Sequence, residues 1–441
     1  MNKEIQKESV QIPHVNLQKY NRKIKKVKLQ GRSELKISDW TQYNLSKKSS
    51  FSHYLWNLNQ NLKQIERIDY QSVNETEFID RFESKNIPVV ILGATDDWKA
   101  KENWTIKKLA YMYRHERFKI GEDDDGKTVY LGAKYYFHYA LKDPYGAIVD
   151  DSPLYIFDAN FGKRRLHHSS RRTKIEKTSK HRYDPESSQA TCHLVDDYKV
   201  PKYFRDDLFS LVGSRRPPFR WIVIGPARSG TGIHTDPLGT SAWNTLLVGR
   251  KRWVLFPPGT AKHIVHPKLS DQEGATWFDQ VYPKMMEYTT ADKTKTLGEQ
   301  LKMMEIIQNP GETVFVPSGW WHIVINIDFT IAVTQNFCSK TNLETVWLKA
   351  RYSRPKMAMK LRSILESNNT ELKLKKKRKK INHQSIIDFN SLDTIPTLRN
   401  LDFKYLFVAI SSSPSTSTTC SSSDSDVDVI CECHGKRRRS S

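Results

Sequence analysis

The chain has 441 residues, with 71 Lys and Arg against 49 Asp and Glu, which gives a formal net charge of +22. This excess favours acidic partners such as RNA, DNA or an anionic membrane surface, and a hydrophobic content of 38% with 11 Trp supports a substantial folded core. The five Cys are few and scattered, which argues against a disulfide scaffold, and no apolar run reaches the ~20 residues that a membrane-spanning helix needs.

The N-terminal part of the chain is a basic segment followed by a mixed region. Residues 1–50 are polar and basic, most densely at 22–28, and they lack the apolar stretch of a signal peptide. Residues 87–93 predict a buried strand, and Thr105 is expected to cap a helix. The basic stretch at 163–182 predicts a mobile loop. Nucleic-acid binding and a merely solvated run of charge are both open for it.

The middle of the chain predicts a β-rich fold. Short runs rich in β-branched and aromatic residues alternate with turns that contain Gly, Pro or Asp, the pattern of an all-β barrel or sandwich. These runs cover residues 219–225, 241–249, 252–257, 312–317, 321–327 and 329–337. A small antiparallel barrel of this kind can carry a metal at its mouth.

Three residues in this region have the chemistry of a metal site. His234 and Asp236 form a His-x-Asp pair, and a distant His322 follows Gly319, Trp320 and Trp321. Two imidazoles and one carboxylate are the ligand set of mononuclear non-heme Fe(II) oxygenases, which leave the remaining metal positions open for cosubstrate and O₂. On an extended strand, residues two apart point to the same face, so the first pair can bind one ion.

The His-x-Asp motif alone is a weak signal, because three common residues recur by chance. For the bare motif, a surface loop with a solvated His and Asp is the better interpretation. The strand-like runs on both sides of the pair and of His322 change this balance. The sequence therefore predicts an Fe(II) centre formed by His234, Asp236 and His322.

Longer motifs around these residues resemble those of the Jumonji-C oxygenases. The resemblance rests on residues 228–244, 251–253, 310–317, 319–322 and 334–337, with further matches at 150–158 and 197–201. It extends from about residue 87 to about residue 354. The motifs are long and occur in the order found in the family, so chance similarity is not a serious alternative. The resemblance implies a double-stranded β-helix of the cupin type, mainly β with flanking helices, and basic and Ser-rich tails that are disordered.

The resemblance also implies that 2-oxoglutarate is the cosubstrate. A buried dicarboxylate needs a cation and hydroxyl donors. The matching positions are Lys251 and Thr334, assisted by Asn244 and Thr231, with Tyr155 and Asn336 as expected neighbours. Alternation along residues 330–337 places Thr334 and Asn336 on one face and more apolar residues on the other. Taken alone, Lys251 would instead be read as a solvated turn lysine.

These observations divide the chain into five parts. A basic segment covers 1–50, the N-terminal part of the catalytic fold covers 51–186 with a basic insertion near 163–195, and the Jumonji-C barrel covers 187–354. A helical segment at 355–370 follows, with helix expected from about residue 345, and members of the family are linked to self-association through helices here. A disordered basic and Ser-rich tail occupies 371–441.

Clusters of basic residues at 22–28, 373–380 and 436–439 predict a nuclear protein, although an ordinary solvated linker is the alternative for 373–380. Cys431, Cys433 and His434 lack a second ligand pair, so an unstructured tail is preferred to a metal site there.

The predicted activity is protein hydroxylation that depends on Fe(II) and 2-oxoglutarate. As the resemblance implies, the substrates are lysines of Lys- and Arg-rich nuclear proteins such as splicing factors and histones, and RNA is an expected partner. Histone arginine demethylation is an alternative, because the iron chemistry is shared. A further alternative is a non-catalytic cupin shell that binds RNA or phosphatidylserine in apoptotic-cell clearance, which would not need a cosubstrate pocket.

Overall fold

The computed structural model describes residues 12–163, 194–269, 271–289 and 293–378, and of residues 368–378 it describes only the backbone. The predicted loop at 163–182 lies outside this part of the chain beyond residue 163. The predicted disordered tail at 371–441 also lies outside it from residue 379 on, but residues 371–378 are helical, so the prediction of disorder was wrong there. The cysteines and the histidine at 431–434 lie outside the described residues as well.

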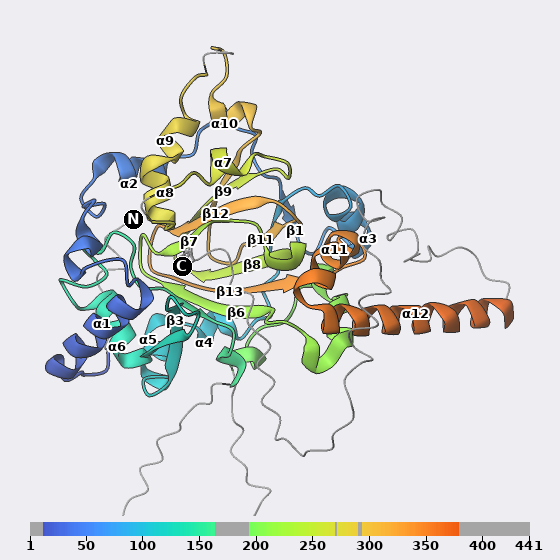
Figure 1. Cartoon of the computed structure of the whole chain (residues 1–441), viewed down its shortest axis with the longest axis horizontal. Coiled ribbons are helices and arrows are strands. Elements are labelled where there is room, and N and C mark those ends of the chain that lie inside the picture. Colours follow the sequence, from blue (N-terminus) through green and yellow to red (C-terminus); the bar gives the residue numbers. More distant parts are fainter. Residues whose placement is uncertain (1–11, 164–193, 270, 290–292, 379–441) are drawn as a thin grey trace, which may run out of the picture.

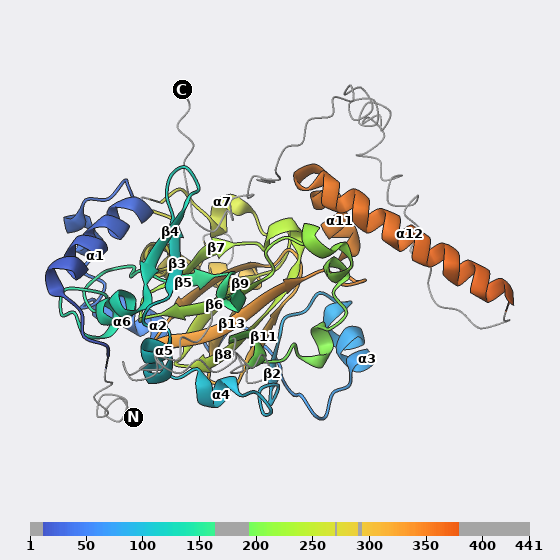
Figure 2. The ribbon, with the colours of Figure 1, turned by 90° about the horizontal axis from the view of Figure 1, so that it is seen from below.

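Two β-sheets face each other at the centre of the molecule (Figures 1 and 2). The seven-stranded sheet has the order β1 (Arg67–Asp69), β2 (Val89–Leu92), β11 (Thr313–Val316), β8 (Ser241–Val248), β13 (Thr330–Phe337), β6 (Arg220–Gly225) and β5 (Ile156–Asp158). The four-stranded sheet has the order β10 (Met304–Gln308), β9 (Lys251–Phe256), β12 (Trp321–Asn326) and β7 (Gly230–His234). A separate hairpin joins β3 (Arg117–Glu122) and β4 (Thr128–Gly132).

The six strands predicted around the metal motif are all present, as is the buried strand predicted at 87–93, which is β2. The predicted runs did not include β1, β3, β4, β5 or β10. The two-sheet, mainly β architecture with flanking helices confirms the predicted fold class.

Side chains along each strand point alternately into the space between the two sheets and toward an outer face. On β9, Trp253 and Leu255 pack inward against Val314 of the opposite sheet. Their neighbours Val254 and Phe256 point outward into a different cluster that contains α8 and α9. Because side chains two apart share a face, Lys251 at the start of β9 lies on the inner side with Trp253.

Helices cover both outer faces. The N-terminal layer comprises α1 (Leu17–Gly31), α2 (Ser49–Trp56), α3 (Glu75–Phe78), α4 (Ala100–Asn103), α5 (Ile106–Met112) and α6 (Ala133–Leu141). The later helices are α7 (Lys262–Val265), α8 (Gly274–Gln280), α9 (Tyr282–Met285), α10 (Leu297–Gln300), α11 (Leu343–Ser353) and α12 (Pro355–Arg378). Thr105 caps α5 as predicted, since its side chain accepts a hydrogen bond from the backbone N–H of Lys108.

Helix α1 gives the N-terminal segment a structural role that its composition did not predict. Tyr20, Ile24 and Val27 recur at helical spacing and are buried against the main core. Lys28, part of the basic cluster at 22–28, is also buried, and its Nζ lies 2.6 Å from a carboxylate oxygen of Asp150. Part of this basic cluster therefore holds the fold together.

The C-terminal helices α11 and α12 form a smaller cluster beside the barrel, and α12 projects from the body of the molecule (Figures 1 and 2). The predicted single helical segment is broken at Arg354, because Pro355 disfavours helical geometry in the residue before it. Within the described residues, no helix combines the length and apolar character needed to cross a membrane.

Candidate metal and cosubstrate site

The three residues predicted to bind iron come together where β7 meets β12. His234 ends β7 and is the direct antiparallel partner of His322 on β12. Asp236 follows β7 with φ −60° and ψ 143°, the extended geometry expected before Pro237. Ligand atoms of the three side chains lie within 4.8 Å of one another. This arrangement lets all three reach one metal ion, and their assignment as its ligands stays a prediction.

Both imidazoles are oriented by their own strands. Nδ1 of His234 donates to the carbonyl oxygen of Gly232 at 2.7 Å, and Nδ1 of His322 donates to that of Trp320 at 3.1 Å. Because a carbonyl only accepts, these bonds make Nδ1 the protonated nitrogen in each ring. Each ring therefore carries its lone pair on Nε2, the usual arrangement of metal-binding histidines.

The carboxylate of Asp236 lacks the partners that a buried charge normally has. Oδ2 is buried, with no hydrogen-bond partner among the described residues. Burial raises the pKa of Asp236, while His322 and a hydrogen bond from Asn336 act in the opposite direction. An unpaired carboxylate away from water is costly, so a cation here would compensate it. Two imidazoles and one carboxylate fit Fe(II) in particular.

A β-bulge in β7 brings Thr231 to the inner face. His322 pairs with His234, but Val324, two residues on, pairs with Thr231, three residues back. Without this extra residue, simple alternation from His234 would point Thr231 outward. The side chain of Thr231 instead makes a hydrogen bond with Tyr155. The two side chains are therefore in contact, whereas strand alternation alone would have pointed Thr231 outward; their role in binding the cosubstrate stays a prediction.

Lys251 is fully buried, so the alternative of a solvated turn lysine is wrong. Its Nζ donates to Oδ1 of Asn326 at 2.8 Å and to the hydroxyl of Tyr155 at 3.4 Å. Burial lowers the pKa of Lys251 to about 7, with no nearby carboxylate to oppose the shift. A buried ammonium without an opposing charge is the cation that the far carboxylate of a dicarboxylate requires.

Asn326 is the residue that sequence reasoning missed. It is the cross-strand partner of Lys251, accepts from its ammonium, and donates through Nδ2 to Oγ of Ser229 at 2.9 Å. Its position four residues after His322 on the same strand, with side chains on the same face, was the available signal. Along β12 the two residues are roughly 13 Å apart, which leaves room for a small dicarboxylate between metal and lysine.

Thr334 and Asn244 face each other across β13 and β8. Oγ1 of Thr334 donates to the carbonyl of Trp243 at 2.8 Å, and Oδ1 of Asn244 is buried without a partner within the described chain. Asn336 donates to Thr240 at 2.9 Å and is near Asp236. The structure therefore places Lys251, Thr334, Asn244, Thr231 and Asn336 on strands of the two sheets and Tyr155 directly before β5.

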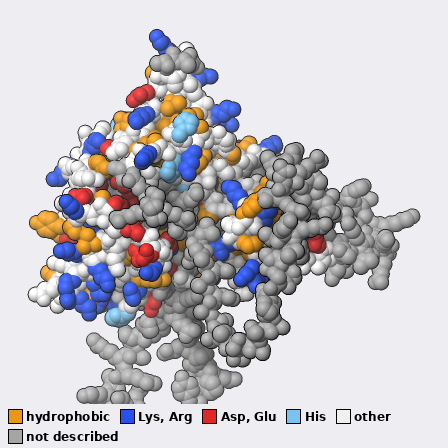
Figure 3. All heavy atoms as spheres, viewed as in Figure 1, with side chains coloured by type: hydrophobic (Ala, Val, Ile, Leu, Met, Phe, Trp, Pro, Cys, Tyr) orange, Lys and Arg blue, Asp and Glu red, His pale blue; other side chains and the backbone are white. Residues whose placement is uncertain are grey.

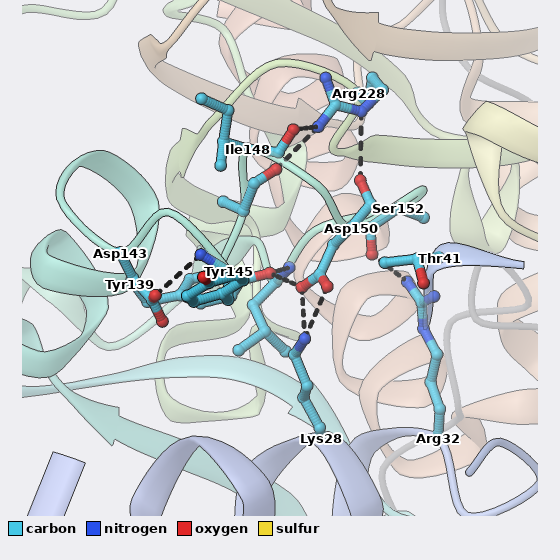
Figure 4. A network of polar contacts seen from close by, with 12 residues as sticks. Lys28, Arg32, Thr41, Tyr139, Asp143, Tyr145, Ile148, Asp150, Ser152 and Arg228 are labelled. Atoms are coloured by element: carbon cyan, nitrogen blue, oxygen red, sulfur yellow. Dashed lines mark hydrogen bonds and ion pairs between the residues drawn. The ribbon is translucent and has the colours of Figure 1, made fainter. Parts of the chain in front are cut away.

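A second polar network ties this pocket to helix α1 (Figure 4). The turn that carries Ser229 begins at Arg228, whose φ of 69° is unusual for a residue other than Gly. The guanidinium of Arg228 donates to the carbonyl oxygens of Ala147, Ile148 and Asp150. Asp150 in turn binds the ammonium of Lys28 and the hydroxyl of Tyr139. The turn next to Asn326 is thus held by the N-terminal helix.

Comparison with known proteins agrees with this site. A family profile described as a cupin-like domain matches residues 75–342. The bifunctional arginine demethylase and lysyl-hydroxylase psr-1 of Caenorhabditis briggsae is 45% identical over 317 residues, which cover 70% of this chain and 71% of that protein. The chain belongs to the cupin-like Jumonji-C oxygenase family.

Two further relatives extend the comparison. The protein of the same name from Caenorhabditis elegans is 46% identical over 300 residues, 67% of this chain and 66% of that protein. The 2-oxoglutarate and iron-dependent oxygenase JMJD4 homolog of Drosophila melanogaster is 26% identical over 319 residues, 65% of this chain and 66% of that protein. The two cofactors of this oxygenase family are iron and 2-oxoglutarate. They match the metal-ligand cluster and the pocket of the buried lysine.

The affinity for 2-oxoglutarate is expected to fall as the pH rises above about 7. Lys251 has a pKa of about 7 without an anion beside it. A bound carboxylate favours its charged form, so binding above this pH must take up a proton. The dissociation constant should rise by up to about tenfold per pH unit between the two pKa values.

Anaerobic isothermal titration calorimetry at pH 7, 8 and 9, in buffers of different ionisation enthalpy, measures both the affinity and the proton uptake. The same shift makes the ligand-free protein gain stability from about pH 7 upward, because the unfolded chain, with an ordinary lysine pKa, binds more protons there. Binding that is independent of pH across this window, with no proton uptake, would contradict the prediction.

Proposed function

We propose that this oxygenase hydroxylates lysine side chains of Lys- and Arg-rich nuclear proteins, such as Arg/Ser-rich splicing factors and histones. One observation carries the proposal: the carboxylate of Asp236, whose Oδ2 has no hydrogen-bond partner among the described residues, and the buried ammonium of Lys251, which has only neutral partners there, both lie at the space between the two sheets. The printed name of the psr-1 relatives includes lysyl-hydroxylase activity, which supports lysine as the residue oxidised.

The residues of this chain would divide the work as follows. His234, Asp236 and His322 hold iron from one side and leave the other side open for cosubstrate and O₂. The ammonium of Lys251 and the hydroxyl of Thr334 bind the far carboxylate of 2-oxoglutarate. When bound, iron and 2-oxoglutarate supply the oxidation of an unactivated C–H bond by O₂, with 2-oxoglutarate converted to succinate and CO₂.

The substrate is tested by incubating the full-length protein with Fe(II), 2-oxoglutarate, O₂ and an Arg/Ser-rich peptide that contains one lysine. Mass spectrometry should find one added oxygen atom on the lysine side chain, with succinate formed in equal amount. A peptide with arginine in place of that lysine is the matched control and should stay unmodified. Unmodified lysine in the presence of steady 2-oxoglutarate turnover would overturn the lysyl assignment.

Arginine demethylation is the second candidate, because the printed name of the same relatives includes it. Hydroxylation of an N-methyl group releases formaldehyde and leaves arginine, so the iron chemistry is unchanged. Loss of methyl groups from methylarginine peptides, with formaldehyde released and lysines untouched, would favour this candidate. A non-catalytic binding shell is disfavoured, since a binder has no use for a buried lysine whose pKa is lowered to about 7.

Nuclear localisation, RNA as a partner and self-association through α11 and α12 are further parts of the proposal. The net charge of +22 supports contact with RNA, which could also bridge a basic enzyme and its basic substrates. The basic run at 373–380 begins within α12 and is the densest cluster. By contrast, the cluster at 22–28 lies in the folded helix α1 with Lys28 buried.

Replacing the basic residues of 373–380 with glutamine should therefore reduce nuclear accumulation more than the same change at 22, 23, 25 and 26. A fluorescent fusion measured as a nuclear-to-cytoplasmic ratio gives the result. An unchanged ratio after all three clusters are neutralised together would remove the argument for these signals.

A further inference from the structure

A basic hollow of about 490 Å³ lies between helix α1 and the β3–β4 hairpin, and it involves none of the residues assigned to iron or 2-oxoglutarate. Figure 3 shows Lys and Arg side chains gathered over the α1 side of the molecule, at the lower left. Six cationic side chains line the hollow: Lys19, Lys23, Lys26, Arg114, Arg117 and Lys134.

These cations converge because of how the elements pack. Lys19, Lys23 and Lys26 recur every three or four residues along α1, so they form one stripe beside the apolar stripe that docks the helix. Arg117 begins β3 and Lys134 lies in α6, both of which pack against α1. Like charges at this helical spacing destabilise a helix, so the arrangement has a cost without an anionic partner.

Among the described residues, one acidic side chain lines the hollow against six cations. None of the six cations makes an ion pair there, and partial burial together with the cations Lys19, Arg117 and Lys26 lowers the pKa of Lys23. The acid in the lining, Asp123, accepts hydrogen bonds from the backbone N–H groups of Asp125 and Lys127 and so belongs to the hairpin turn.

The aromatic rings of the hollow are already covered by cations. The guanidinium of Arg117 lies 5.5 Å from the ring centre of Tyr130, and the ammonium groups of Lys23 and Lys134 lie 5.5 and 5.2 Å from that of Tyr135. Bases of single-stranded nucleic acid bind by stacking on free aromatic faces. The hollow therefore offers concentrated positive charge rather than base recognition.

We propose that this hollow is a binding site for closely spaced phosphate groups, as carried by a compact polyphosphate such as an inositol polyphosphate. Several cations from three elements can each contact a different phosphate, and charge-assisted bonds of this kind are roughly twice as strong as neutral ones. The backbone of a nucleic acid also carries phosphate groups, at wider spacing, and is the alternative ligand for the hollow. The site is independent of oxygenase turnover.

Isothermal titration calorimetry of the full-length protein with inositol hexakisphosphate tests the proposal directly. The double variant Lys19→Gln/Lys23→Gln should bind at least about tenfold more weakly, because two of the converging charges are lost. The matched control is Arg22→Gln/Lys25→Gln, which removes the same charge from exposed positions of the same helix that do not line the hollow. It should change the affinity by less than about twofold, and unphosphorylated inositol should not bind.

Competition with a mixed-sequence RNA oligonucleotide distinguishes a compact polyphosphate from a nucleic acid as the ligand. RNA that displaces inositol hexakisphosphate, and that is weakened by the Lys19→Gln/Lys23→Gln change alone, supports the site with nucleic acid as a natural ligand. Equal weakening by both double variants would show attraction to net charge only and overturn the site. Failure of inositol hexakisphosphate to bind the unaltered protein, with RNA binding weakened only by the Lys19→Gln/Lys23→Gln change, would overturn the compact ligand in favour of nucleic acid. Equal thermal unfolding of both variants verifies their fold.

Discussion

Replacing Lys251 with Met is expected to raise the KM for 2-oxoglutarate by about thirtyfold or more, while the ligand-free protein becomes more stable. Removing one partner of a buried charge pair costs about 2–5 kcal/mol of binding free energy. The stability change has the opposite sign, because burial that lowers the lysine pKa from 10.5 to about 7 destabilises the folded state by an amount on the order of 4 kcal/mol at pH 7.

Met matches the lysine stem in volume and carries no charge. The gain in stability is therefore reduced mainly by the hydrogen bond that Asn326 loses. Each kcal/mol gained in the free energy of unfolding should raise Tm by about 2–4 °C. Differential scanning calorimetry and 2-oxoglutarate turnover measure the two effects on one sample. Lys107→Met, at an exposed helix position, is the control and should change neither. A lower Tm together with an unchanged KM would contradict the role assigned to Lys251.

Replacing Asp236 with Ala is expected to abolish 2-oxoglutarate turnover by removing the anionic ligand of the iron site. The barrel should remain folded, since the lost carboxylate is buried and its Oδ2 has no partner among the described residues. The decisive measurement is the shift of Tm on adding Fe(II) under anaerobic conditions. The unaltered protein should gain about 2.7 kcal/mol at a hundredfold excess of metal over its dissociation constant, and the variant should gain almost nothing.

Asp206→Ala removes an exposed carboxylate and controls for the change in net charge. It should keep both the metal-dependent shift and the turnover. Succinate formation by Asp236→Ala at the rate of the unaltered protein would overturn the assignment of iron to this cluster.

Much of the barrel could be predicted because its strands alternate regularly. Residues 329–337 predicted that Thr334 and Asn336 face a pocket while Ile331 and Val333 pack behind, and the latter two indeed lie in the main hydrophobic cluster. Asp236 was correctly expected to be extended, because Pro237 restricts its backbone. Local steric rules of this kind act within a few residues and are visible in the sequence.

Features that depend on long-range pairing could not be predicted in this way. The bulge that turns Thr231 inward exists only because β7 pairs with β12 out of simple register. Burial of Lys251 follows from the position of β9 between β10 and β12, which local composition does not specify. The docking of α1 depends on Asp150, more than a hundred residues away, so composition indicated only a basic segment.

The connection between α1 and Asp150 has a consequence for the order in which the protein folds during synthesis. A helix of 15 residues with a stripe of like charge is marginal by itself, so α1 cannot form stably until its docking partners have emerged. Asp150 follows Lys28 by 122 residues, and Arg228 follows Asp150 by 78 more. Asn326, which orients Lys251, is made later still. Helix α1 therefore leaves the ribosome before the residues that hold it in place, and no partial chain ending before β12 can bind the cosubstrate.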